Sequence, residues 1–289
     1  MNYESMIDSL DENTQMNFLE NALEVIDLNE GFDVGDKIDN IKKTVMKFFD
    51  YISQKITTFI AWVKKKLHIG DAKADANAIN AALKEKPIDL SGENIKFEEI
   101  HKNRVIALLT LQDEGINDIE KISRIAADNS ASRNKDRVDG VREMHEKYQS
   151  KVKELGLSAD SSKSDIYNSM LKNSTIGKVT SATVNSLVAE IDYTQKLIDS
   201  ANVKANKFNA ACKTAKSNIA KIPNIKDSDT PQLIKNETLK KICSDLMGET
   251  RLTFNVITKA FKTLVKHKSK TEATISRIKA KVSTPSKSN

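Results

Sequence analysis

The chain has 289 residues, enough for one large domain or two ordinary ones, and a formal net charge of +6. Nine glycines, four prolines and an aromatic content of 5% favour long helices and disfavour a β-sandwich or barrel. Two cysteines, Cys212 and Cys243, argue against a disulfide scaffold, and the lack of a secretory signal or of an apolar run near ~18–20 residues predicts a protein made in soluble form.

The first thirty residues form an acidic segment that differs from the rest of the chain. They carry no lysine or arginine, and their eight acids are Glu4, Asp8, Asp11, Glu12, Glu20, Glu24, Asp27 and Glu30. Residues 31–289 hold all 46 bases and 32 acids, so this body alone has a charge of about +14. We expect residues 1–30 to be an amphipathic segment that is removed or docks separately.

The clearest helix is predicted over residues 38–67, where apolar side chains recur at steps of three and four. We interpret this stripe as a core helix of a bundle. The alternative is a helix that lies on a membrane or binds a partner, with lysines 64–66 at the lipid head groups. The side chains that would form such a surface are Phe48, Phe49, Ile52, Phe59 and Trp62.

The remaining pattern predicts further helices separated by short connectors. Before residue 156 we expect an alanine-rich helix over 71–84, a loop over 87–94, a long helix from near Lys96 to Ala126 and a charged helix over 135–155. A connector over 156–164 follows. After it we expect a short helix over 167–171, a long helix over 184–222, and a final helix over 231–282 that is interrupted near 266–274. The predicted fold class is all-α: an elongated bundle of three or four long helices with shorter helices packed alongside. A sub-boundary of the body 31–289 is expected near 156–164.

The sequence lacks the motifs of common enzyme classes. It has no phosphate-cradling glycine loop, no nucleophile elbow and no zinc-protease motif. Glu98 and His101 match half of a di-iron motif, but no other histidine follows a glutamate at this spacing. Residues 71–77 resemble a calcium loop only superficially, because Lys73 stands where a carboxylate is needed. We therefore expect a protein that is not an enzyme and has no metal and no cofactor.

The C-terminal region is strongly basic. Residues 251–289 hold ten bases and a single acid, Glu272. Such a helix can neutralise phosphates without reading base sequence, and its binding weakens with salt. An ordinary solvated face is the alternative, although one acid is too few for pairing along the helix. The candidate DNA contacts are Arg251, Lys259, Lys262, Lys266, Lys268, Lys270, Arg277, Lys279 and Lys281.

A possible processing site lies where the acidic segment gives way to the basic body. The tetrapeptide Leu28-Asn29-Glu30-Gly31 resembles the sites of prohead proteases in T4-like tailed bacteriophages, which cut after Glu in a Leu/Ile-x-Glu context before a small residue. It is the only full match, because Leu10-Asp11-Glu12 is followed by Asn13. The protease-like tetrapeptide and the change from acidic to basic composition therefore both place a boundary at Glu30–Gly31.

This resemblance implies an internal head protein of such a phage. In that family a short N-terminal peptide directs the protein into the scaffold core, the protease removes the peptide, and the basic remainder stays with packaged DNA. The expected partners are DNA, bound without sequence preference, the prohead protease, and scaffold and capsid proteins. The expected location is inside the capsid, after assembly in the host cytoplasm. The alternatives are a membrane-active helical protein that acts in genome delivery and an unprocessed helical adaptor or scaffold protein.

Overall fold

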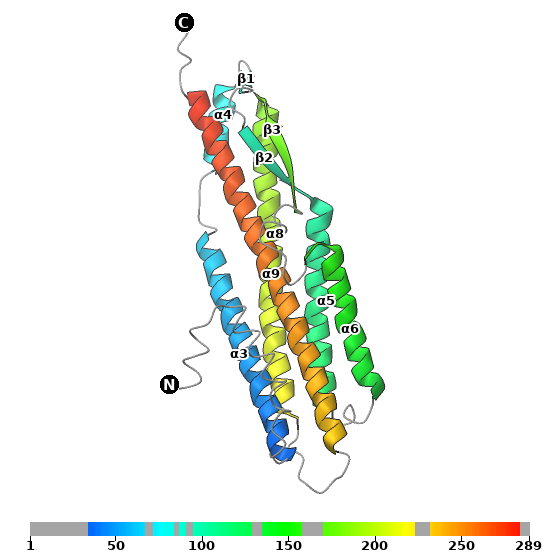
Figure 1. Cartoon of the computed structure of the whole chain (residues 1–289). Helices are drawn as coiled ribbons and strands as arrows, with labels where there is room; N and C mark the ends of the chain where they lie inside the picture. Colours follow the sequence, from blue (N-terminus) through cyan, green and yellow to red (C-terminus); the bar gives the residue numbers. More distant parts are fainter. Residues whose placement is uncertain are drawn as a thin grey trace, which may run out of the picture. The chain divides into compact units, whose positions relative to one another are not determined.

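The computed structural model describes residues 34–66, 72–83, 87–90, 95–128, 135–157, 170–222 and 232–283 (Figure 1). Within these residues the fold is all-α, as predicted, with two short antiparallel strand pairs. The helices are α3 (Val34–Lys66), α4 (Ala72–Ala82), α5 (Lys102–Ala127), α6 (Lys135–Glu154), α8 (Ser181–Ala220) and α9 (Gln232–Ser283). The strands are β1 (Ile88–Asp89), β2 (Ile95–Ile100), β3 (Leu171–Ile176) and β4 (Lys178–Val179).

The chain forms two compact units, and each is assembled from three separate segments. Unit 1 comprises Met1–Thr58, Thr110–Ala159 and Ala205–Val256, and unit 2 comprises Phe59–Leu109, Asp160–Lys204 and Ile257–Asn289. Helices α3, α5, α8 and α9 each contribute residues to both units. The predicted acidic segment 1–30 lies outside the described residues.

The core of unit 1 is built from the apolar stripes that the sequence shows. Phe48, Phe49 and Ile52 of α3 are fully buried, and Phe208 of α8 packs against Phe254 of α9 with ring centroids 6.2 Å apart. Small residues, which let a neighbouring helix approach closely, fill most of the other buried positions of α8 in this unit: Ala205, Ala211, Cys212 and Ala215. Both cysteines are free and buried, and burial raises the pKa of the Cys243 thiol to about 12. They are therefore unreactive core residues.

Unit 2 contains both strand pairs (Figure 1). Strands β2 and β3 are antiparallel, with Ile95 opposite Ile176 and Ile100 opposite Leu171, and these four side chains are buried. The expected loop over 87–94 contains β1, which pairs with β4. The prediction of helix from near Lys96 is wrong over β2, where the helix α5 begins only at Lys102. Of the short helix predicted over 167–171, residues 167–169 lie outside the described residues, Met170 is helical and Leu171 begins β3. The partners of these strands lie more than seventy residues away, so local periodicity does not reveal the pairing.

Helix α9 is continuous, so the break expected over residues 266–274 is wrong. Threonines occupy buried positions where the sequence pattern lacks apolar residues. The hydroxyls of Thr263, Thr271 and Thr274 donate to the carbonyls four residues earlier, at 3.0, 3.0 and 2.9 Å. Because each hydroxyl is satisfied within the helix, these threonines can face the core without an unpaired polar group.

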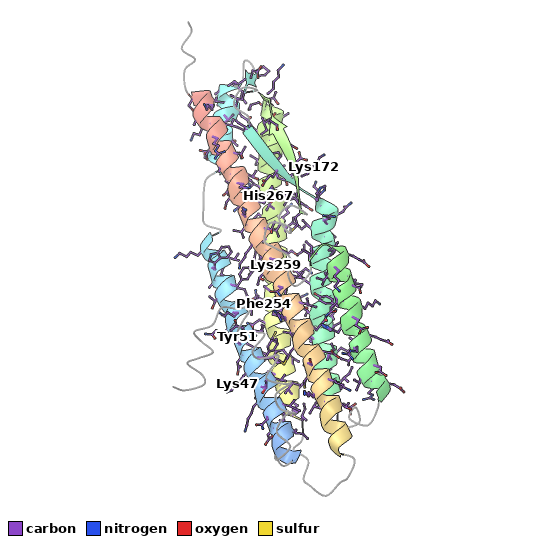
Figure 2. All side chains as sticks on the ribbon, viewed as in Figure 1. Lys47, Tyr51, Lys172, Phe254, Lys259 and His267 are labelled. Atoms are coloured by element: carbon purple, nitrogen blue, oxygen red, sulfur yellow. The ribbon has the colours of Figure 1, made fainter. Side chains whose placement is uncertain are left out.

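A buried polar contact attaches α9 to α8 and to the end of β2 in unit 2. His267 of α9 is fully buried, and its Nε2 lies 3.2 Å from Oε1 of Glu190 on α8. The same carboxylate oxygen accepts a hydrogen bond from the backbone N–H of Ile100 at 2.9 Å. Burial by itself would raise the pKa of Glu190, but the hydrogen bonds from His267 and Ile100 lower it below its ordinary value. Figure 2 labels His267 on α9.

Glu190→Gln should reduce the acid sensitivity of the fold. Because the pKa of Glu190 is lower in the folded chain, its stabilising contribution is present above about pH 4.5 and is lost as the pH falls through the folded value. We expect the variant to be less stable than the wild type by about 1–3 kcal/mol at pH 7 and to approach it at pH 3. Urea unfolding at both pH values measures this difference. Parallel pH profiles for the two proteins would contradict the assignment.

Candidate nucleic-acid interface

Six bases of α9 in unit 2 lie on one face of the helix. At 100° per residue they fall within an arc of about 100°, and they extend over about 33 Å of helix. We call them the α9 basic stripe: Lys259, Lys262, Lys266, Lys270, Arg277 and Lys281. Lys259 is half-buried and the other five are exposed. Figure 2 labels Lys259.

The opposite face of α9 fixes the orientation of the stripe. Phe261, Leu264, Ile275 and Ile278 are buried in unit 2, so the bases between them must face outward. Phe261 packs edge-on against Phe59 of α3 with ring centroids 5.5 Å apart. The ammonium of Lys262 lies 5.6 Å from the centroid of the same Phe59 ring. Packing of the apolar face therefore presents the basic face to solvent.

Three of the nine predicted DNA contacts are not part of the stripe. Arg251 is half-buried and belongs to unit 1. Lys268 pairs with Glu272 at 3.5 Å, and Lys279 pairs with Asp75 of α4 at 2.7 Å. The hydrogen bond from Lys279, with a second from Ser276, lowers the pKa of Asp75. These ion pairs reduce the charge that Lys268 and Lys279 can offer to a phosphate.

A basic hollow of about 350 Å³ opens beside the start of α5 in unit 2. Its basic lining residues are Lys102, Arg104 and Lys172; His101 lies beside them, and Glu99 is the only acid among its lining residues. Lys172 of β3 is the strand partner of Glu99 on β2, and the neighbouring Glu98 pairs with Lys270 of the stripe at 2.9 Å. Strand β2 therefore adjoins the hollow through Glu99 and contacts the stripe through Glu98. This hollow could not be predicted from the sequence, because its bases come from segments about seventy residues apart.

The net charge is concentrated in unit 2. Over its full sequence, unit 2 holds 23 Lys and Arg residues and 13 Asp and Glu residues. Outside the segment 1–30, unit 1 holds 23 bases and 19 acids. The formal charges are thus +10 for unit 2 and +4 for this part of unit 1. The stripe and the hollow both belong to the more positively charged unit.

The structure separates the aromatic residues that could have formed a membrane or partner surface. Phe48, Phe49 and Ile52 are in the core of unit 1, and Phe59, 8% exposed, is in the core of unit 2. Those four are core residues and do not form an exposed surface. Trp62 is 38% exposed and stacks on Phe59 with ring centroids 5.8 Å apart. Among the described residues, no helix combines the length and apolar character needed to cross a bilayer.

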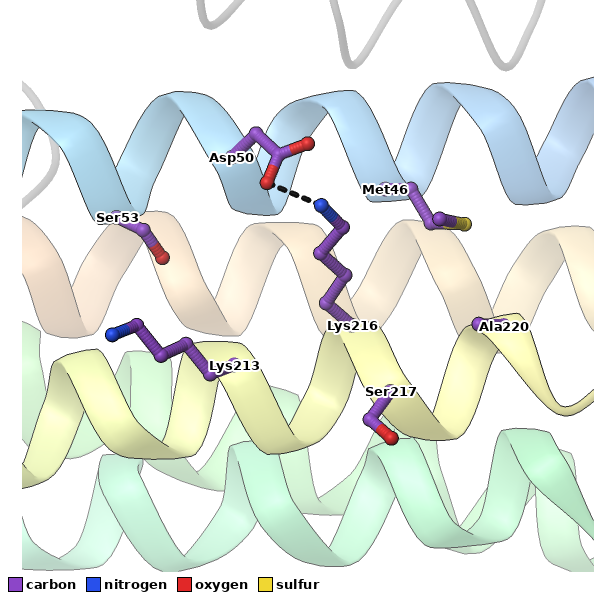
Figure 3. Close-up of a pocket in the computed structure, with 7 residues that line it drawn as sticks. All are labelled: Met46, Asp50, Ser53, Lys213, Lys216, Ser217 and Ala220. Atoms are coloured by element: carbon purple, nitrogen blue, oxygen red, sulfur yellow. Dashed lines mark hydrogen bonds and ion pairs between the residues drawn. The ribbon is translucent and has the colours of Figure 1, made fainter.

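A second hollow, of about 400 Å³, lies between α3 and α8 in unit 1 (Figure 3). Lys213 and Lys216 line it together with Ser53 and Ser217. Lys216 is engaged with Asp50 at 2.5 Å, as the dashed line in Figure 3 shows. This ion pair neutralises half of the positive charge of the lining, so the groove is a weaker candidate for binding an anion than the stripe.

Two further sequence motifs concern other kinds of site. The cleavage site Leu28-Asn29-Glu30-Gly31 lies outside the described residues. Of the half di-iron motif, Glu98 pairs with Lys270 and His101 is exposed. In the part of the chain that the structure describes, His, Cys, Asp and Glu side chains form no group of three or more suited to a metal ion.

Three comparisons bear on the identity of the protein. The chain was compared with protein-family models, with curated proteins and with solved structures. None of these comparisons finds a match. The stripe, the hollow and the motifs of the sequence therefore carry the functional proposal.

Proposed function

We propose that the protein is a non-enzymatic structural protein of a tailed-phage virion, and that its basic body binds packaged DNA after cleavage between Glu30 and Gly31. The observation that carries DNA binding is the α9 basic stripe, whose exposed bases share one helical face. The resemblance of Leu28-Asn29-Glu30-Gly31 to prohead protease sites supports packaging and processing. The expected partners and location follow from the same resemblance.

The stripe suits phosphates better than base edges. It consists of lysine and arginine, with Ala273 and Ala280 on the same face. Base-specific recognition commonly uses an element inserted in the major groove with Asn, Gln or Arg side chains, whereas dispersed lysines neutralise the backbone of any sequence. Phosphate contacts by the five stripe bases other than Lys270, which pairs with Glu98, would give a log–log dependence of affinity on salt with a slope of about −4.5.

Removal of residues 1–30 would change this interaction. The eight carboxylates of that segment are a local source of negative charge that can compete with DNA for the stripe. Cleavage after Glu30 would raise the net charge of the chain from +6 to about +14. We therefore expect the processed body to bind DNA more tightly than the full chain does.

Fluorescence anisotropy with a labelled DNA duplex of arbitrary sequence tests the proposal. The full chain and the product 31–289 are titrated at several salt concentrations between 50 and 200 mM. We expect salt-dependent binding by the product, with a slope of about −4.5, and weaker binding by the full chain. If neither protein binds at the lowest salt, DNA association is wrong. Mass spectrometry of the protein from mature particles tests cleavage, and an intact Met1 end would refute it.

A membrane-active protein is the second candidate function, and the exposure of Trp62 favours it. Trp62 lies on α3 close to the exposed Lys64 and Lys65, which is the arrangement of an interfacial aromatic residue beside head-group cations. This candidate expects dye leakage from anionic vesicles that is abolished by Trp62→Asp. Leakage that is unaffected by this substitution would exclude Trp62 as the contact.

A further inference from the structure

Helix α6 of unit 1 is anchored by few apolar side chains. Only Val141, Tyr148 and Val152 of its hydrophobic residues are buried, over a helix of 20 residues. In the unit 1 part of α8, six buried residues occupy positions 205–219: Ala205, Phe208, Ala211, Cys212, Ala215 and Ile219. Elements with little buried apolar area open locally at low free-energy cost. The attachment of α6 must therefore depend on its polar contacts.

Those polar contacts converge on α9 and α5. His145 Nδ1 lies 2.7 Å from Oε2 of Glu249, and the hydroxyl of Thr253 lies 3.2 Å from that of Tyr148. Lys151 pairs with Glu114 of α5 at 2.6 Å. Glu249 and Thr253 are completely buried on α9. The contact area of α6 is thus centred on a buried carboxyl group.

The surroundings of Glu249 oppose its negative charge. Its Oε1 is buried and has no hydrogen-bond partner among the described residues. The acids that face it are Asp118 of α5 and Asp245 of α9, with Glu114 and Glu146 nearby, and the opposing bases are His145, Arg142 and Lys151. Burial, only partly offset by His145, raises the pKa of Glu249 to about 7. Burial also raises the pKa values of Asp118 and Asp245.

We propose that α6 opens locally from unit 1, and that the protonation state of the buried Glu249 centre sets how often it opens. When Glu249 holds a proton, its carboxyl group can share it with His145 across the 2.7 Å contact. Loss of the proton leaves a buried carboxylate beside two other acids. Opening of α6 hydrates that carboxylate and uncovers the α5 and α9 surfaces on which Tyr148 packs.

The direction of the pH dependence follows from the difference between the closed and the open state. In the closed state the pKa of Glu249 is about 7, and in the open, hydrated state it returns toward 4.5. The stabilisation of the closed state is therefore complete below about pH 4.5 and is lost as the pH rises to about 7. Above pH 7 Glu249 is deprotonated in both states, so its titration no longer changes the opening equilibrium. Because burial also raises the pKa values of Asp118 and Asp245, their protonation likewise favours the closed state at lower pH.

Hydrogen–deuterium exchange of the full chain at pH 5, 6, 7 and 8 tests the proposal after correction for intrinsic exchange rates. We expect the protection factors of the Val141–Val152 amides to fall at least about tenfold from pH 5 to pH 7 and then to level off. The amides of α8 at positions 205–220 in the same unit are the internal reference and should change less. Equal pH dependence of α6 and α8 would overturn the proposal.

Two variants separate titration from simple loss of packing. Glu249→Gln keeps a hydrogen-bonding side chain without a charge, so α6 protection should become independent of pH. Tyr148→Phe removes the hydroxyl that contacts Thr253, so protection should fall by a similar factor at every pH. If Glu249→Gln does not fold, Asp245→Asn removes a neighbouring charge and should move the midpoint to lower pH. If α6 protection in Glu249→Gln or in Asp245→Asn depends on pH as it does in the wild type, the proposal is overturned.

Discussion

The combined substitution of Lys262, Lys266, Arg277 and Lys281 by Gln should weaken DNA binding about a hundredfold or more at 50 mM salt. These four side chains are exposed members of the α9 basic stripe. Each lost phosphate contact should reduce the steepness of the log–log salt dependence by about 0.9, so the slope should become about 3–4 units shallower. Lys270 is left unchanged because its ammonium pairs with Glu98. Anisotropy titrations over a range of salt concentrations measure both quantities.

A matched variant controls for net charge. Replacing Lys147, Lys153, Lys207 and Lys241 by Gln also removes four exposed bases, but all four lie in unit 1 and none lines the second hollow. If the stripe is the DNA contact, this control should lose less than about tenfold in affinity, through long-range electrostatics alone. Equal losses in the two variants would show that DNA responds to overall charge and not to the stripe.

Gly115→Ala should be among the most destabilising single substitutions in unit 1, at about 3 kcal/mol. A Cβ at this position would lie 2.2 Å from Oγ1 of Thr253 and 2.6 Å from the hydroxyl oxygen of Tyr148. Both side chains are buried, so the methyl group must separate α5 from α6 and α9 or break the contact between the two hydroxyls. Overpacking and a lost buried hydrogen bond each cost about 1–3 kcal/mol. Denaturant unfolding followed by circular dichroism measures the loss.

Gly140→Ala is the matched control for this prediction. Gly140 is also within a helix, α6, and a Cβ there meets no atom within 4 Å. Alanine at such a position should stabilise the fold by about 0.5–1 kcal/mol, because it restricts the unfolded chain. Opposite signs for the two glycines would confirm that close helix contact, and not helix propensity, makes Gly115 necessary. Stabilisation by both alanines would show that the contact around Gly115 can relax.

The long helices could be predicted from the sequence because their buried faces are apolar at helical spacing. The stripe over 184–222 corresponds to α8, Ser181–Ala220, and the stripe over 38–67 to α3, Val34–Lys66. Where polar residues occupy buried positions, apolar spacing does not predict the helix correctly. Thr271 and Thr274 break the apolar pattern of α9, yet their hydroxyls bond within the helix. Strand β2 was missed because Ile95 and Phe97 find their partners on a distant strand.

The candidate interface could be predicted only as a set of bases. The excess of lysine after residue 250 is visible in the sequence, but the sequence does not show which of these lysines face solvent. Asp75 engages Lys279 from a residue about two hundred positions earlier in the chain, and Glu98 similarly engages Lys270. Such pairings depend on tertiary structure, as does the hollow that brings Lys172 near Lys102.

The interleaving of the two units has a consequence for synthesis on the ribosome. Each unit takes its last described segment from α9, so neither core can close until that helix has emerged. Until then the apolar stripes of α3, α5 and α8 have no complete set of packing partners. Contacts over such long sequence separations form late and slowly, and incomplete chains with exposed apolar faces associate readily. Nascent chains of this protein should therefore bind ribosome-associated chaperones until α9 has emerged.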